Sequence, residues 1–266
     1  MNFCFGIPSF FVELKSLFYI HSSNLIKFKH FKSLLCSCIV LPLRKKATQM
    51  KHINHKELQS YERIYRGNLV NSITGFKSAN LLATRSKDGV DNVAIFSSVT
   101  HLGSNPALFS FVQRPLGYGA GDTYYNLKET GKITLNHIPV SLVNKAHQSS
   151  SKYEKHVSEF EELGIEKLER EGYAVPFVKE SPVQLVAEYV NEYYLEENKC
   201  ILVICKITDV FLDPDILHED GWLDLGKAGT VTINGLDGYA AAKTEKRLSY
   251  AQVDKELYEI SLKTGN

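Results

Sequence analysis

The stretch "NLLATRSKDGVDNVAIFSSVTHLGSNPALFSF", residues 80–111, alternates apolar runs with turn signals. Two of the runs, residues 79–86 and 91–98, flank a turn with Asp-Gly at its centre, which is typical of a β-hairpin. A third run, residues 107–114, follows a Gly-Ser-Asn-Pro turn. We therefore expect three successive antiparallel strands, and this meander decides the fold class.

More strands and some helices are expected further along the chain. The expected strands are residues 132–138, 183–195 and 199–212. One helix is expected at residues 122–131, with Asp122 as its N-cap and Gly131 at its end. Two short helices are expected within residues 140–164. The length and the Val, Ile and Tyr content of the last two strands suit a sheet that curls into a barrel. Residues 235–256 are expected to be turn-rich and then helical. The pattern indicates a mainly β domain, a β-barrel with α insertions.

The composition is that of a globular protein, with 44% hydrophobic and 23% charged residues and a formal net charge of +1. Seven of the 31 basic residues but only one of the 30 acidic residues lie in residues 1–49, so the remainder is mildly acidic. An acidic body disfavours nucleic-acid binding. Cys200 and Cys205 stand at an odd spacing on one strand, so they face opposite sides and are not expected to pair. Free cysteines favour a reducing, cytoplasmic compartment.

Residues 1–49 differ from the rest in their basic and aromatic character. Their apolar stretches are too short or too interrupted to span a bilayer. We treat them as a leader outside the fold, with Met50 as the expected true start. A loosely attached extension and a membrane or sorting segment stay open as alternatives. Residues 50–266 are expected to form one domain.

Several common motifs are missing from the sequence. It has no G-x-G-x-x-G at a strand–helix junction, no G-x-x-x-x-G-K-[ST] and no G-x-S-x-G. Its histidines do not stand at metal-ligand spacing. The glycine-rich residues 117–121 are expected to form a loop. The chain is thus not expected to have a Rossmann site, a P-loop, a hydrolase nucleophile or a metal.

Hydroxyl groups gather where the second strand of the meander ends, at residues 96–100. Hydroxyls and backbone N–H groups there could bond the edge of a flat heterocycle or a phosphate. Arg114 ends the next strand and could clamp a phosphate, and the helix start at Thr123 attracts anions. Asn126 lies one turn along on nearly the same helix face. Each feature taken alone has a simpler explanation, as a solvated turn, a surface ion pair or a helix cap.

Taken together, these features resemble the flavin reductase-like family with its FMN-binding split barrel, which includes flavoredoxin and the reductase components of two-component monooxygenases. The resemblance covers roughly residues 70–215. The matching stretches are "NLLATRSKDGVDNVAIFSSVTHLGSNPALFSF", "GDTYYNLKETGKITLNHI", "SSSKYEKHVSEFEELGI" and "ESPVQLVAEY". One departure is Gly121, where many members have a basic residue before the Asp-Thr pair.

The resemblance implies a set of cofactor-binding residues. The residues implied to line the isoalloxazine and the ribityl chain are Phe96, Ser97, Ser98, Val99 and Thr100. Those implied to hold the phosphate are Arg114, Thr123 and Asn126. Ser151 and Tyr153 are implied to close over the flavin. Asn136 either contacts the flavin or pins its strand. No side chain has to act as an acid or base, although His101 could donate a proton or steer a nicotinamide. His137 and His147 are expected to be structural or surface residues.

The implied function is that of an NAD(P)H-dependent flavin oxidoreductase using FMN, or alternatively FAD. The protein would pass electrons to a flavin-dependent monooxygenase or another acceptor, and it would form a homodimer with the flavin at the interface. Two other functions stay open. One is a flavin-binding electron carrier without turnover, and the other is a β-barrel interaction module without a cofactor.

Overall fold

The computed structural model describes residues 50–117 and 121–262. The chain divides into two compact units, residues 1–53 and 54–266, and the fold described below is that of the second unit. The expected leader, residues 1–49, lies outside the described residues, and so does most of the expected loop 117–121. No helix among the described residues is long and apolar enough to cross a membrane.

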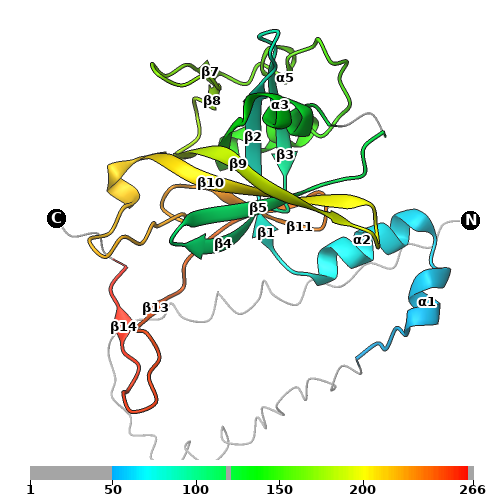
Figure 1. The fold of residues 1–266 in the computed structure, drawn as a ribbon. Coiled ribbons are helices and arrows are strands. Elements are labelled where there is room, and N and C mark those ends of the chain that lie inside the picture. The colour runs from blue at the N-terminus through cyan, green and yellow to red at the C-terminus, as the bar shows by residue number, and fades with distance from the viewer. Residues whose placement is uncertain (1–49, 118–120, 263–266) are drawn as a thin grey trace, which may run out of the picture. The chain divides into compact units, whose positions relative to one another are not determined.

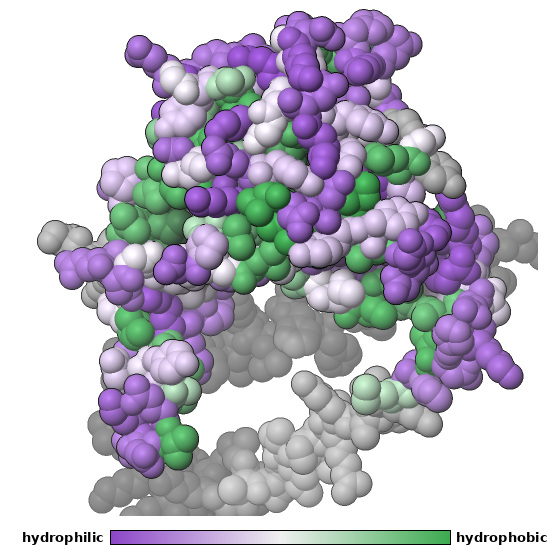
Figure 2. Space-filling model, viewed as in Figure 1, coloured by the Kyte–Doolittle hydropathy of each residue, from purple (hydrophilic) through white to green (hydrophobic). Residues whose placement is uncertain are grey.

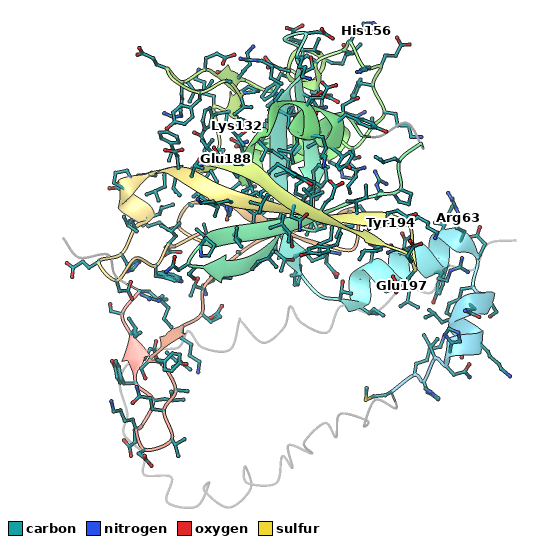
Figure 3. All side chains as sticks on the ribbon, viewed as in Figure 1. Arg63, Lys132, His156, Glu188, Tyr194 and Glu197 are labelled. Atoms are coloured by element: carbon teal, nitrogen blue, oxygen red, sulfur yellow. The ribbon has the colours of Figure 1, made fainter. Side chains whose placement is uncertain are left out.

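A seven-stranded antiparallel sheet forms the centre of the unit, with strand order β3-β2-β6-β9-β10-β5-β4. Its strands are β2 (Asn80–Arg85), β3 (Asp91–Phe96), β4 (Thr100–Ser104), β5 (Ala107–Gln113), β6 (Lys132–His137), β9 (Val183–Leu195) and β10 (Cys200–Leu212). The long strands β9 and β10 run side by side through the middle of the unit (Figure 1). Lys132 and Glu188 form an ion pair across β6 and β9 (Figure 3). The mainly β prediction is confirmed.

Smaller elements flank this sheet. The helices are α1 (His55–Ser60), α2 (Arg63–Ile73), α3 (Asp122–Thr130), η1 (Val140–Leu142), α4 (Val143–Gln148), α5 (Glu159–Glu162) and η2 (Pro214–Ile216), and the other strands are β1 (Lys77–Ser78), β7 (Lys167–Leu168), β8 (Phe177–Val178), β11 (Val231–Asn234), β12 (Gly238–Ala241), β13 (Arg247–Leu248) and β14 (Glu259–Ile260). Strands β1, β11 and β12 form a second sheet. The prediction of a helix in the later part of residues 235–256 is wrong, because the described residues there form β12, β13 and irregular structure.

Helix α3 lies where the sequence predicts it, but its cap differs. Asp122 is the first helical residue rather than the N-cap, which is Gly121, and no side chain caps the helix there. Gly131 ends the helix as expected, with a left-handed φ of 72° and an N–H bond to the Leu127 carbonyl. A side chain is strained in that conformation, so glycine suits the position.

Two hydrophobic clusters form the core on opposite faces of β2. Leu81 and Ala83 belong to one cluster, and Leu82, which points the other way, belongs to the second. Both faces of β2 are therefore covered, which explains why three apolar residues follow one another at positions 81–83. Cys205 is buried in the second cluster and Cys200 is half-buried, and both are free, as expected. Burial raises the pKa of the Cys205 thiol to about 12, so it stays an unreactive thiol.

Candidate functional site

A cleft of about 610 Å³ opens beside the ends of β3 and β5. This volume is in the usual range for a cofactor or small-molecule site. Seven of the predicted binding residues line it: Phe96, Ser97, Ser98, Arg114, Thr123, Ser151 and Tyr153. They come from the end of β3, the end of β5, the start of α3 and the segment after α4. The structure thus brings together residues that the sequence keeps up to several dozen positions apart.

The row of hydroxyls marks a break between two strands. β3 ends at Phe96 and β4 begins at Thr100, so Ser97 and Ser98 lie in the gap between them. The Ser98 hydroxyl accepts a hydrogen bond from the Val112 N–H at 3.0 Å, which pins the gap to β5. The Phe96 ring packs edge-on against Phe111 at 5.2 Å. Ser97 and Ser98 therefore line the cleft while Phe96 anchors the segment in the core.

The start of α3 forms a second part of the cleft lining. The first backbone hydrogen bond of α3 runs from the Tyr125 N–H to the Gly121 carbonyl at 2.8 Å. The N–H groups of residues 122–124 therefore come before the first helical hydrogen bond and have no acceptor within the helix. A Cβ on residue 121 would lie 2.8 Å from a Tyr125 ring carbon. A side chain at position 121 would therefore have to displace the Tyr125 ring. Any phosphate here must take its cation from another position.

Arg114 is the cation best placed for that role. It is exposed, follows β5 directly and lines the cleft. Within the described residues its guanidinium has no carboxylate partner, unlike Arg85, which pairs with Asp91 and Glu169. Lys152 is a second exposed cation in the lining. These two side chains leave positive charge available to an anionic ligand.

A buried polar network behind the lining was missed by the sequence reasoning. The Asn92 side-chain N–H₂ donates to both carboxylate oxygens of Glu159 at 3.0 Å, and the Asn92 oxygen accepts from the Thr123 hydroxyl at 2.8 Å. Asn92 and Glu159 also line the cleft. Glu159 is only 5% exposed, and burial raises the pKa of its carboxyl above the ordinary 4.5, helped by the nearby charge of Asp122. The Thr123 hydroxyl is thus fixed by a network that spans β3, α3 and α5.

The raised pKa of Glu159 predicts a change of stability with pH. The folded chain holds this proton more tightly than the unfolded chain, so the free energy of unfolding falls as the pH rises from 4.5 through the folded pKa. Glu159→Gln removes this dependence. We expect the stability of the variant relative to the wild type to increase as the pH rises above 4.5 in urea titrations. Glu161→Gln, exposed on the same helix, is the control and should leave the wild-type slope unchanged; equal slopes for wild type and Glu159→Gln would contradict the assignment.

Four predicted residues do not line the cleft. Val99 packs against the core, and Thr100 is exposed on β4. Asn126 is buried and donates to the Thr84 hydroxyl at 3.2 Å. Asn136 is fully buried, and its amide bonds to the Leu81 carbonyl, the Thr134 hydroxyl and the Val178 N–H. The last arrangement fits the strand-pinning alternative for Asn136.

Two of the histidines singled out in the sequence are placed differently relative to the cleft. His101 lies on β4 with its side chain exposed, and it is not part of the described cleft lining. His147 does line the cleft, where its Nδ1 lies 3.0 Å from the Tyr239 hydroxyl. Its side chain is exposed, which agrees with the expectation of a surface residue. The sequence gives no signal for this contact, because Tyr239 lies in a β-strand that was not foreseen.

Comparison with known proteins identifies the family and the fold of this chain. Residues 75–227 match the model of the flavin reductase like domain. A split-barrel protein from Shewanella frigidimarina NCIMB 400, assigned as a flavin reductase, is 38% identical and superimposes with a TM-score of 0.72 over 76% of this chain and 100% of its own. Nitrilotriacetate monooxygenase component B from Bacillus cereus is 20% identical, with a TM-score of 0.65 over 74% of this chain and 97% of its own. An FMN-binding protein from Thermus thermophilus is 15% identical, with a TM-score of 0.55 over 68% and 93%. The fold is thus the split barrel.

Proposed function

We propose that this chain, which belongs to the flavin reductase like domain family, binds FMN in its cleft and transfers hydride from NADH or NADPH to that flavin. Membership supports a flavin-binding oxidoreductase in general. The proposal of FMN binding rests on one observation: Ser97, Ser98, Arg114 and the start of α3 line the same cleft. A phosphorylated heterocycle needs this combination of neutral polar groups and positive charge.

The donor set fits FMN in two parts. Arg114, the helix start at Thr123 and the exposed Lys152 supply positive charge for the phosphate. Ser97, Ser98 and the backbone between β3 and β4 supply neutral polar groups for the flavin edge. Phe96, held against Phe111, supplies an apolar surface. We place Ser151 and Tyr153 at the rim, where they would close over the bound ring.

The bound flavin supplies the redox chemistry, accepting hydride at its ring and passing electrons on. The residues of the chain would orient the ring, and the Ser97 hydroxyl and the N–H groups of residues 97 and 98 would stabilise the negative charge that reduction places on it. The Asn92–Glu159 network keeps the Thr123 hydroxyl in place. No described side chain in the cleft has to take a proton from carbon, which agrees with the absence of a catalytic dyad.

A homodimer is part of the same proposal. Four apolar side chains about half exposed lie on the two long strands: Val190, Tyr193, Tyr194 and Val210. Tyr194 is labelled near the end of β9 in Figure 3, and Figure 2 shows separate green apolar groups among purple ones over the middle of this face. Exposed apolar patches are typical of protein–protein contacts. The fold shared with nitrilotriacetate monooxygenase component B supports a flavin-dependent monooxygenase as electron acceptor.

An anaerobic titration of the purified chain tests this function. We expect FMN to bind, to take on an altered absorbance spectrum, and to be bleached when a reduced nicotinamide is added. Light scattering on the same sample should give twice the chain mass. Binding of FMN without bleaching by either nicotinamide would favour the electron carrier instead. Absence of flavin uptake by folded protein would refute the proposal.

A further inference from the structure

One wall of the cleft is built from residues outside the segment that matches the family. The match covers residues 75–227. Six lining residues lie before or after it, on α2 and on the β11–β12 hairpin, and we call them the flanking wall: Asn68, Asn71, Ile233, Leu236, Asp237 and Tyr239. All the residues proposed to hold the flavin lie inside the matched segment. The cleft therefore has two walls: the flanking wall, and a wall inside the matched segment that we call the flavin wall.

The flanking wall is held firmly in place. β1 pairs with β11, and Figure 1 shows both strands close to α2. The Lys77 ammonium donates to the Asn71 carbonyl at 2.9 Å and to the Gly235 carbonyl at 3.4 Å. A Cβ on Gly235, whose φ is 66°, would lie 2.9 Å from the Ser72 hydroxyl. This glycine lets the hairpin turn approach α2 closely, which positions Leu236 and Asp237 at the cleft.

The two walls also differ in charge. The flavin wall carries two cations, Arg114 and Lys152, beside the carboxyls of Asp122 and Glu159. The flanking wall has no cationic side chain among its lining residues, and its one charged group is the carboxylate of Asp237. Within the described residues Asp237 forms no ion pair. Burial raises the pKa of the nearby Tyr239 phenol, and the charge of Asp237 adds to that rise. A free carboxylate accepts hydrogen bonds from a diol and repels a phosphate. This chemistry suits a sugar without a phosphate on its ring.

We infer that the flanking wall receives the nicotinamide substrate and that Asp237 selects NADH over NADPH. This inference rests on the proposed function, because it concerns the hydride donor of that reaction. The ribose hydroxyls of NADH would donate to the Asp237 carboxylate. The additional phosphate of NADPH would bring negative charge against the same group, and none of the six lining residues of this wall carries a positive charge to offset it. Leu236, which is 53% exposed, and the Tyr239 ring supply apolar surface beside it.

Steady-state kinetics with both nicotinamides test the inference. The wild type is expected to have the higher kcat/KM with NADH. Asp237→Asn should raise the ratio of kcat/KM for NADPH to that for NADH about 10-fold, equivalent to about 1.4 kcal/mol, and leave the Kd for FMN unchanged. Asp254→Asn, which removes an exposed carboxylate that is not part of the described lining, is the matched control and should keep the wild-type ratio.

The outcomes separate the inference from the function. A wild-type enzyme that prefers NADPH, or a ratio that Asp237→Asn does not change, overturns the inference while the proposed function stands. The same shift in Asp254→Asn would also overturn it, because the effect would then come from net charge. A chain that binds FMN but oxidises neither nicotinamide refutes the proposed function, and the inference with it.

Discussion

Replacing Arg114 with alanine is expected to raise the Kd for FMN about 10-fold and to leave the Kd for riboflavin within about two-fold. Riboflavin lacks the phosphate, so only FMN loses a charge-assisted hydrogen bond. Arg114 is exposed, and solvent therefore weakens the interaction, which keeps the effect well below that of a buried pair. Quenching of flavin fluorescence during titration measures both constants.

Two further variants sharpen this result. Arg114→Lys keeps the charge but not the planar fork, so its Kd for FMN should fall between those of the wild type and Arg114→Ala. Lys246→Ala removes an exposed cation that is not part of the described cleft lining and should change neither constant. An equal loss of FMN and riboflavin affinity in Arg114→Ala would mean that this residue supports the cleft rather than the phosphate.

Replacing Asn136 with leucine is expected to lower the free energy of unfolding by about 3 kcal/mol. The amide oxygen accepts from the buried Val178 N–H at 3.1 Å, and the amide nitrogen donates to the Leu81 carbonyl at 3.2 Å. Leucine has a similar size but leaves the Val178 N–H without its bond, and an unsatisfied buried group costs more than the bond itself contributes. Urea denaturation followed by circular dichroism gives the difference.

The matched control for this prediction is Asn144→Ala, at an exposed position on α4, which should change stability by less than about 0.5 kcal/mol. The folded fraction of Asn136→Leu should still bind FMN, because Asn136 is buried away from the cleft lining. Normal stability together with lost FMN binding would reverse the assignment and make Asn136 a flavin contact.

The sheet was predictable because its signals are local. The Asp-Gly turn between β2 and β3 and the apolar runs of β9 and β10 need no distant partner to be recognised, and β9 has the expected bounds. The second sheet was not predictable in this way. β1 has only two residues, Lys77 and Ser78, and becomes a strand through pairing with Ile233 and Thr232. Such short strands are set by tertiary contacts rather than by propensity.

The cleft was predictable where single segments carry the chemistry, as at Ser97, Ser98 and Arg114. It was not predictable where the chemistry arises from long-range contacts. Asn92 looks like an ordinary strand residue until Glu159, 67 positions away, and Thr123, 31 positions away, meet its amide. The hydroxyl row and the resemblance together predicted Thr100 at the flavin, but strand β4 starts there and the Thr100 side chain is exposed outside the described cleft lining.

The bond between Lys77 and Gly235 joins residues 158 positions apart in the chain. During synthesis β1 stays unpaired until the ribosome has released the β11–β12 hairpin with which it pairs. Closure of so long a loop is slow, and assembly of the second sheet should therefore be a late event in maturation. A nascent chain halted before residue 231 could complete its seven-stranded sheet, yet it would lack Ile233, Leu236, Asp237 and Tyr239, which line one side of the cleft.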